Sequence, residues 1–273
     1  MLIAHLSDLH IAAAGRKAYD KVATDVLLGR CVNHINNLRP EPDLVLVTGD
    51  ITFSGQAEEA ALAGQILADL RMPWYLVPGN HDDPEILRPL QQESLQNKRG
   101  RAVVIREGGS GFDYFLPGHP VHLFGMDSSC RDSPGGMITS DQACWLHSHL
   151  VETGNKPALI FLHHPPVRCG VLETDEDGFE GVDLFGGVVE RFSNIIRVLC
   201  GHIHLASHVN WQGTVVSAAP SMGLGLFLDL TLQLPSAFVV EDPGYFLHYH
   251  TPDGNMVSHL VHVGAETNGP HLF

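Results

Sequence analysis

Short apolar runs alternate with longer amphipathic stretches from the N-terminus to Cys200. The short runs have the length and composition of buried strands, and they are Leu2–Leu6, Leu44–Thr48, Trp74–Val77, Ala158–Leu162 and Ile196–Cys200. The longer stretches have apolar positions at helical spacing, and they are Ala18–Leu38, Ala57–Leu70, Pro84–Gln92, Ser140–Leu150 and Asp183–Phe192. Because strands and helices alternate, we predict a layered α/β domain with parallel βαβ units.

The pattern changes between residues 101 and 127. Three strand-like runs separated by Gly and Pro predict a meander in a second sheet, and they are Arg101–Ile105, Phe112–Leu116 and Val121–Met126. The chain after Gly201 is also rich in strand-like runs, and it has turn sequences at Trp211–Thr214 and Thr251–Gly254. His248 and His250 alternate with Leu247 and Tyr249, which favours a solvent-facing side of a strand.

Residues 222–243 are harder to interpret. Their first part, Met222 to Leu234, is an apolar run with few charges. Such a run fits a core strand, and it fits equally well an exposed patch that pairs with another subunit. Both interpretations stay open at the level of the sequence.

Composition narrows the class of protein. Of the 273 residues, 44% are hydrophobic, enough for the core of one large α/β domain. No apolar run reaches the roughly 18 residues of a membrane span, and the N-terminal residues lack the basic start of a signal peptide, so we expect a cytoplasmic protein without a membrane partner. The net charge of −15 disfavours nucleic-acid polymers. Five scattered cysteines without a C-x-x-C pair predict reduced thiols.

Polar motifs stand directly after five of the strand-like runs. They are Asp8-Leu9-His10, Gly49-Asp50, Gly79-Asn80-His81-Asp82, His163-His164 and Gly201-His202-Ile203-His204. Each motif alone has an ordinary structural interpretation, such as a turn or a helix cap. The carboxyl ends of parallel strands share one edge of a sheet, however, so we expect the motifs to converge. Two carboxylates, an amide and four histidines suit two divalent cations with a bridging hydroxide, a centre that cleaves phosphate esters.

The motif order D-x-H, G-D, G-N-H-[D/E], H, G-H-x-H resembles that of the calcineurin-like metallophosphoesterase superfamily, from Asp8 to His204. The resemblance implies a four-layer α/β/β/α sandwich of two mixed sheets flanked by helices, here with a β-rich C-terminal extension. It places a catalytic domain at residues 1–217. Residues 218–273 would complete the sandwich and make oligomer contacts.

The resemblance also implies roles for individual residues. One metal ion would be held by Asp8, His10, Asp50 and His204, and the other by Asp50, Asn80, His163 and His202, so that Asp50 bridges them. His81 would be the acid that protonates the leaving alkoxide, and Asp82 would orient His81. His164 would lie behind the metal ligands. Mixed oxygen and nitrogen ligands suit Fe, Mn, Zn or Co as the two divalent ions.

Local sequence narrows the branch of the superfamily. Protein phosphatases carry a second Asp and an Arg after G-D, whereas this chain has Ile51-Thr52-Phe53 there. The runs Gly79–Asp83 and His163–Pro166 resemble the bacterial cyclic-nucleotide phosphodiesterases and glycerophosphodiesterases. We therefore expect a homo-oligomeric phosphodiesterase that acts on small phosphodiesters.

Three alternatives remain. The same site suits a phosphonate monoester or phosphomonoester hydrolase. A DNA or RNA exonuclease is disfavoured by the acidic charge and by the lack of a basic stretch with aromatic residues. A catalytically silent scaffold of this fold predicts lost ligands or a lost His81, and the sequence retains all of them.

Overall fold

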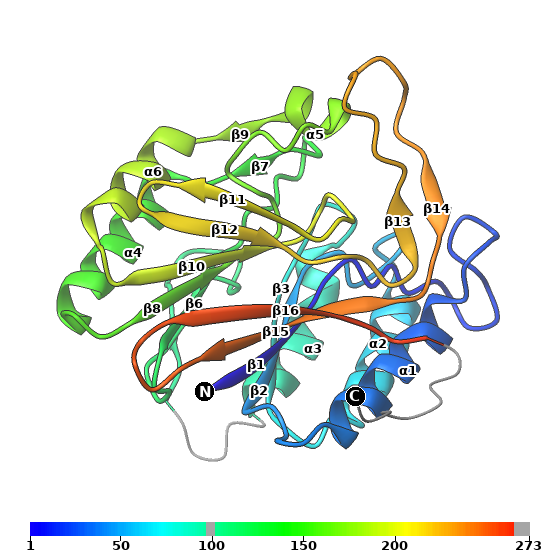
Figure 1. Cartoon of the computed structure of the whole chain (residues 1–273), viewed down its shortest axis with the longest axis horizontal. Helices are drawn as coiled ribbons and strands as arrows, with labels where there is room; N and C mark the ends of the chain where they lie inside the picture. The colour runs from blue at the N-terminus through cyan, green and yellow to red at the C-terminus, as the bar shows by residue number, and fades with distance from the viewer. Residues whose placement is uncertain (97–101, 265–273) are drawn as a thin grey trace, which may run out of the picture.

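The computed structural model describes residues 1–96 and 102–264, and two mixed sheets lie at its centre (Figure 1). In spatial order, the first sheet contains β16 (Met256–His262), β15 (Gly244–His250), β1 (Leu2–Leu6), β2 (Leu44–Thr48) and β3 (Trp74–Val77). The second contains β11 (Ser207–Trp211), β12 (Thr214–Ala218), β10 (Ile195–Cys200), β8 (Ala158–Phe161), β6 (His122–Gly125), β5 (Tyr114–Leu116) and β4 (Val104–Ile105). Strands β1, β2 and β3 are parallel, as are β6, β8, β10 and β12.

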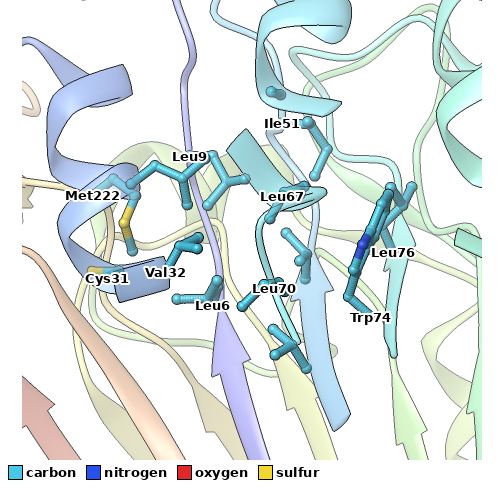
Figure 2. Packing of buried hydrophobic residues seen from close by; sticks show 14 of the residues in the cluster. Leu6, Leu9, Cys31, Val32, Ile51, Leu67, Leu70, Trp74, Leu76 and Met222 are labelled. Carbon is cyan, nitrogen blue, oxygen red and sulfur yellow. The ribbon is translucent and has the colours of Figure 1, made fainter. Parts of the chain in front are cut away.

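Helices cover the outer face of each sheet. The first sheet packs against α1 (Thr24–Asn37), α2 (Ala57–Leu67) and α3 (Pro84–Gln96), and the second against α4 (Ser140–Thr153) and α6 (Val182–Arg191). Figure 2 shows the first of these helix–sheet cores, with Leu6, Val32 and Trp74 among its members. A third apolar cluster fills the space between the sheets. The four-layer α/β/β/α fold expected from the sequence is thereby confirmed.

Alternate side chains of a strand belong to different apolar clusters. In β1, Ala4 and Leu6 face the helices, whereas Ile3 packs between the sheets. His5 shares the face of Ile3 because alternate residues of a strand point the same way. Every central strand is covered on both faces, which explains why these runs are continuously apolar.

Smaller elements surround the rim. A hairpin of β13 (Leu224–Leu226) and β14 (Phe238–Val240) projects from the body (Figure 1). The strands β7 (Gly136–Met137) and β9 (Phe179–Glu180) pair beside α5 (Leu172–Asp177), a short helix that the sequence pattern did not indicate. Among the described residues, no helix has the length and apolar character needed to cross a bilayer.

Element boundaries differ from the sequence prediction at several places. The helix predicted from Ala18 begins at Thr24 instead, because Tyr19 and Asp20 adopt positive φ and cannot continue a helix. The predicted strand start at Arg101 lies outside the described residues, and β4 begins at Val104. Both predicted turns are confirmed, at β11–β12 and β15–β16.

Two expectations for the C-terminal region differ from the structure. His248 does not face solvent: it is fully buried between the sheets, because β16 and the second sheet cover β15. The run Met222 to Leu234 divides, since Met222 and Leu224 are buried and the residues from Phe227 onward are exposed. The division of the chain at residue 217 stays a prediction.

Candidate metal centre

The structure brings the side chains of the five polar motifs together beyond the carboxyl ends of parallel strands. Asp8 and His10 follow β1, Asp50 follows β2, Asn80 and His81 follow β3, His163 follows β8, and His202 and His204 follow β10. The strands belong to both sheets, so the site lies where the rims of the two sheets meet.

Two carboxylates and two imidazoles form a first group, Asp8, His10, Asp50 and His204, whose candidate ligand atoms lie within 4.8 Å of one another. Nε2 of His10 lies 2.9 Å from Nε2 of His204 and 3.5 Å from Oδ2 of Asp50. Nε2 of His204 lies 3.4 Å from Oδ1 of Asp8. These four residues are the set that the resemblance assigns to one metal ion.

A second group surrounds the amide of Asn80. Its Oδ1 lies 3.1 Å from Nε2 of His163 and 3.0 Å from Nδ1 of His202. Nε2 of His163 also lies 3.5 Å from Oδ1 of Asp50. Asp50 thus directs one carboxylate oxygen to each group, which is the placement required of a bridging ligand.

Backbone carbonyls fix the orientation of two rings. Nδ1 of His163 donates to the carbonyl of Thr48 at 2.6 Å, and Nδ1 of His204 donates to the carbonyl of Leu224 at 2.7 Å. Each ring therefore turns its Nε2 toward the carboxylate and amide oxygens. Because nitrogen and oxygen electron pairs converge in this way, the donor set fits divalent cations of the Zn, Fe, Mn or Co type.

His164 lies within the same distance of His163 and His202 but is a poorer ligand. Oγ of Ser128 accepts the backbone N–H groups of His163 and His164, at 3.2 and 3.1 Å, so its own proton points to Nδ1 of His164 at 2.9 Å. Burial, with His163 and His202 nearby, keeps the pKa of His164 well below its usual value. The neutral ring then carries its proton on Nε2 and has no free electron pair for a metal ion.

The electrostatics of the centre favour positive charge. Burial lowers the pKa of His163, but the Asp50 and Asp8 carboxylates outweigh it and raise that pKa to about 9. Burial raises the pKa of Asp50, and the surrounding histidines reverse this and hold it well below the usual range. The buried carboxylates thus stabilise a cation between the rings.

Two motif glycines permit the close approach of these segments. A Cβ on Gly201 would overlap Oγ of Ser7 and come within 2.6 Å of Oδ2 of Asp8. A Cβ on Gly79 would overlap the Asp50 carboxylate. The glycines in G-N-H and G-H-x-H are therefore needed for space at these two positions.

His81 and Asp82 have different surroundings. The His81 ring lies edge-on to His10 with centroids 4.7 Å apart, and its Nδ1 is 2.9 Å from the carbonyl of Phe53, so Nε2 is the nitrogen left for a substrate. The Asp82 carboxylate accepts the N–H groups of Ile51, Thr52 and Gly79. Asp82 therefore ties the Asp50 loop to the Asn80 loop, and its carboxylate does not hold the His81 ring.

Two pockets meet at Asn80. One, of about 430 Å³, extends from Asn80, His202 and His204 to the β13–β14 hairpin, and Leu226 and Phe238 contribute its apolar wall. Among its described lining residues there is no Lys or Arg.

The other pocket, of about 320 Å³, is polar. Its lining residues include Asn80, Arg131 and the acidic residues Asp82, Asp83, Glu85 and Asp127. A substituent on each side of a phosphate bound at Asn80 would therefore meet a different environment.

Sequence reasoning missed several parts of this rim. The ring of Tyr19 packs against Phe53 and Phe238, with centroids 4.9 and 5.1 Å apart, and forms an aromatic wall. The carbonyl of Leu224 orients His204. No periodicity or motif marks these contacts, because they join segments that are distant in the sequence.

Known proteins resemble this chain in both sequence and fold. Residues 1–206 match the family of calcineurin-like phosphoesterases. The chain is 32% identical to the "Probable glycerophosphodiester phosphodiesterase GpdQ" of Arcobacter nitrofigilis, over 100% of this chain and 97% of that protein. It is 26% identical to the "3',5'-cyclic adenosine monophosphate phosphodiesterase CpdA" of Escherichia coli, over 80% of this chain and 75% of that one. A solved dimetal phosphatase from Danio rerio shares the fold, with a TM-score of 0.55 at 13% identity over 97% of this chain and 99% of that one.

Proposed function

The chain belongs to the calcineurin-like phosphoesterase family, and we propose that it is a binuclear metal-dependent phosphodiesterase acting on small phosphodiesters of the glycerophosphodiester or cyclic-nucleotide type. The observation that carries this proposal is the convergence of carboxylate, amide and imidazole donors into two adjacent groups that share Asp50. Relatives named as glycerophosphodiester and cyclic-nucleotide phosphodiesterases support the substrate class.

The proposed ligands divide as the two groups do. Asp8, His10, Asp50 and His204 would hold one cation, and Asp50, Asn80, His163 and His202 the other. Two bound divalent cations would neutralise the phosphodiester and supply an activated water for in-line attack at phosphorus. Iron, manganese, zinc and cobalt all suit these donors.

The remaining chemistry belongs to the side chains. The carbonyl of Phe53 holds Nδ1 of His81, so His81 presents Nε2 toward the substrate and protonates the departing alkoxide from there. Asp82 fixes the two loops that carry Asp50 and Asn80 relative to each other.

The two pockets favour a diester over a monoester. A diester has two substituents, and Asn80 lines both an apolar pocket and a polar pocket that can each receive one. A monoester has one substituent and an additional negative charge. The described residues that line the pockets include a single cationic side chain of Lys or Arg type, Arg131, for that charge.

The substrate class is tested by comparing bis(p-nitrophenyl) phosphate with p-nitrophenyl phosphate on the metal-reconstituted enzyme. We expect a higher kcat/KM for the diester, with Asp50→Ala as the inactive control. Faster cleavage of the monoester would favour the phosphomonoesterase alternative. A protein that binds two metal equivalents but cleaves neither these esters nor a phosphonate monoester would instead be a scaffold of this fold.

Assembly and location complete the proposal. The β13–β14 hairpin exposes an apolar surface, Phe227, Leu228, Leu230, Leu232, Leu234, Val239 and Val240. We propose that a second copy of the chain covers this surface in a homo-oligomer, because exposed apolar surfaces of this kind mark association sites. All five cysteines are free, which supports a reducing compartment such as the cytoplasm.

A further inference from the structure

A continuous series of hydrogen bonds runs through the space between the sheets, from the half-buried Ser258 on β16 to the start of the Asp50 loop. Oγ of Ser258 lies 2.8 Å from Nδ1 of His248, and Nε2 of His248 lies 3.2 Å from Nδ1 of His5. Nε2 of His5 lies 2.8 Å from Oγ1 of Thr48. Both histidines, Thr48 and Ser7 are fully buried.

The series ends at a carbonyl that also binds a proposed metal ligand. Oγ1 of Thr48 donates to Oγ of Ser7 at 2.9 Å, and Oγ of Ser7 donates to the carbonyl of Thr48 at 3.0 Å. The same carbonyl accepts Nδ1 of His163 at 2.6 Å. Oγ of Ser7 also fills the space that a Cβ on Gly201, the residue before His202, would need.

The direction of every bond follows from this end. The Thr48 carbonyl and the Asp8 carboxylate, the two acceptors beside the Ser7 hydroxyl, only accept, so the single proton of Ser7 points to them and the proton of Thr48 must then point to Ser7. Thr48 consequently accepts from Nε2–H of His5. A neutral His5 has no proton on Nδ1, so it accepts from Nε2–H of His248, which in turn accepts from Ser258.

The burial of the two rings supports their neutral state. Burial lowers the pKa of His5 to about 3 and holds the pKa of His248 well below its usual value. Aliphatic side chains would fill the same space without the cost of burying polar groups. The polar pair is therefore better explained by the bonds it directs than by packing.

We propose that His5 and His248 are positioning residues that hold Thr48 and Ser7 in place, so that the carbonyl of Thr48 keeps the His163 ring turned with Nε2 toward the metal centre. This role rests on the proposed function, because it takes His163 to be a metal ligand. The two histidines touch neither substrate nor metal and act through Thr48.

The first test is the protonation pattern of the two rings. ¹⁵N-histidine spectra of the zinc-loaded full chain distinguish a protonated ring nitrogen from a bare one. We expect His5 and His248 both to be neutral, with the proton on Nε2, at neutral pH. A proton on Nδ1 of His5 would reverse the direction of the bonds and overturn the proposal.

The second test is zinc affinity, measured by competition with a chelator. His5→Phe should weaken zinc binding by roughly 10- to 100-fold, the range typical for partners that orient metal ligands. His5→Gln retains a donor and an acceptor and should restore most of the affinity. The control is His122→Phe, because His122 is also a buried ring, stacked on Phe115 at 5.0 Å, and takes no part in these bonds.

A second pair of variants covers the case in which His5→Phe does not fold. Thr48→Val keeps the shape of the side chain and removes its hydroxyl, whereas Thr48→Ser keeps the hydroxyl. Zinc affinity should fall in the first and persist in the second. A lower melting temperature with unchanged zinc affinity in His5→Phe, or in Thr48→Val where His5→Phe does not fold, would show a purely structural role. A wild-type chain that binds no zinc would refute the proposed function instead, and the ring spectra would still be measurable without metal.

Discussion

At the scale of single residues, five of the seven expected ligands are held in unusual backbone conformations. Positive φ values occur at Asp8 (52°), His10 (44°), Asp50 (50°), His202 (71°) and His204 (55°). Non-glycine residues seldom adopt this region, and it persists where the surrounding structure enforces it, most often at functional sites. The positive φ bends the backbone just after each strand end, and the bend directs the ligand side chains toward the shared rim of the sheets.

Asp50 offers the sharpest test of the ligand assignment. Because its two oxygens face both groups, Asp50→Ala should remove or weaken both metal ions, whereas Asn80→Ala should weaken only one. Elemental analysis of the purified variants measures this directly. Two full equivalents of metal in Asp50→Ala would show that the carboxylate does not bridge.

His81 separates proton transfer from metal binding. Its ring lies beside the groups and is held by the Phe53 carbonyl, so His81→Ala should keep its metal content. Turnover of substrates with alkoxide leaving groups should fall by roughly 10²- to 10⁴-fold. The loss should be much smaller for a nitrophenolate, which departs without a proton. Steady-state kinetics on both substrate types decide the matter, and equal losses would contradict the acid role.

At the scale of elements, the C-terminal strands are part of the sheet that carries the site. β15 pairs antiparallel with β1, the strand that leads into Asp8. The backbone N–H of Met222 donates to the carbonyl of Asp8 at 3.2 Å, so the segment before β13 also supports the centre. Removing the chain after residue 220 would delete β15 and leave β1 paired with β2 alone, so contacts of the hairpin are better probed by point substitution.

The buried histidine pair between β1 and β15 should make stability depend on pH. The unfolded rings take up protons below their ordinary pKa of 6.5, whereas native His5 resists protonation to about pH 3 and native His248 stays neutral well below 6.5. The contribution of the two neutral rings to the free energy of unfolding is therefore full above pH 6.5. It falls as the pH drops below 6.5, by up to about 1.4 kcal/mol per pH unit for each ring. Denaturant unfolding at pH 7 and pH 5 should show a smaller loss for His248→Gln than for the wild type. An identical loss would mean that the ring is protonated in the native state.

At the scale of the whole molecule, apolar exposure is concentrated on one projection. Leu230 is 72% exposed on the β13–β14 hairpin, whose base contributes Leu226 and Phe238 to the apolar pocket. A second copy packed on the hairpin would therefore lie close to the substrate entrance. A net charge of −15 on each copy opposes association through charged surface, so the proposed oligomer would depend on this apolar surface.

Light scattering tests this arrangement. The intact protein should exceed the monomer mass of 29.7 kDa, and the double variant Leu230→Asp, Leu234→Asp should shift toward it. Val151→Asp is the matched control, because Val151 is an exposed apolar residue on the outer helix α4. A wild-type monomer would contradict the oligomer proposal and leave the assignment of the metal centre untouched.

The sequence by itself determined the central strands, most helices and the convergence of the motifs. Runs such as Leu44–Thr48 are buried on both faces, so their boundaries are visible as apolar patterns. The parallel order then places Asp8 and Asp50 at the neighbouring ends of β1 and β2 in the first sheet. In the second sheet it places His163 and His202 at the neighbouring ends of β8 and β10. These features depend on local periodicity and on a general rule of α/β topology, and both can be recognised without coordinates.

Only the tertiary structure decided the features that depend on contacts between segments distant in the sequence. His248 has the alternation of a surface residue but is buried, because β16 and the second sheet cover its strand. The carbonyls of Thr48 and Leu224 orient His163 and His204, and a backbone carbonyl carries no mark in the sequence. The apolar run from Met222 is buried at its start and exposed from Phe227 onward. Both parts are equally apolar in sequence, so only the packing of the folded chain distinguishes core residues from surface residues.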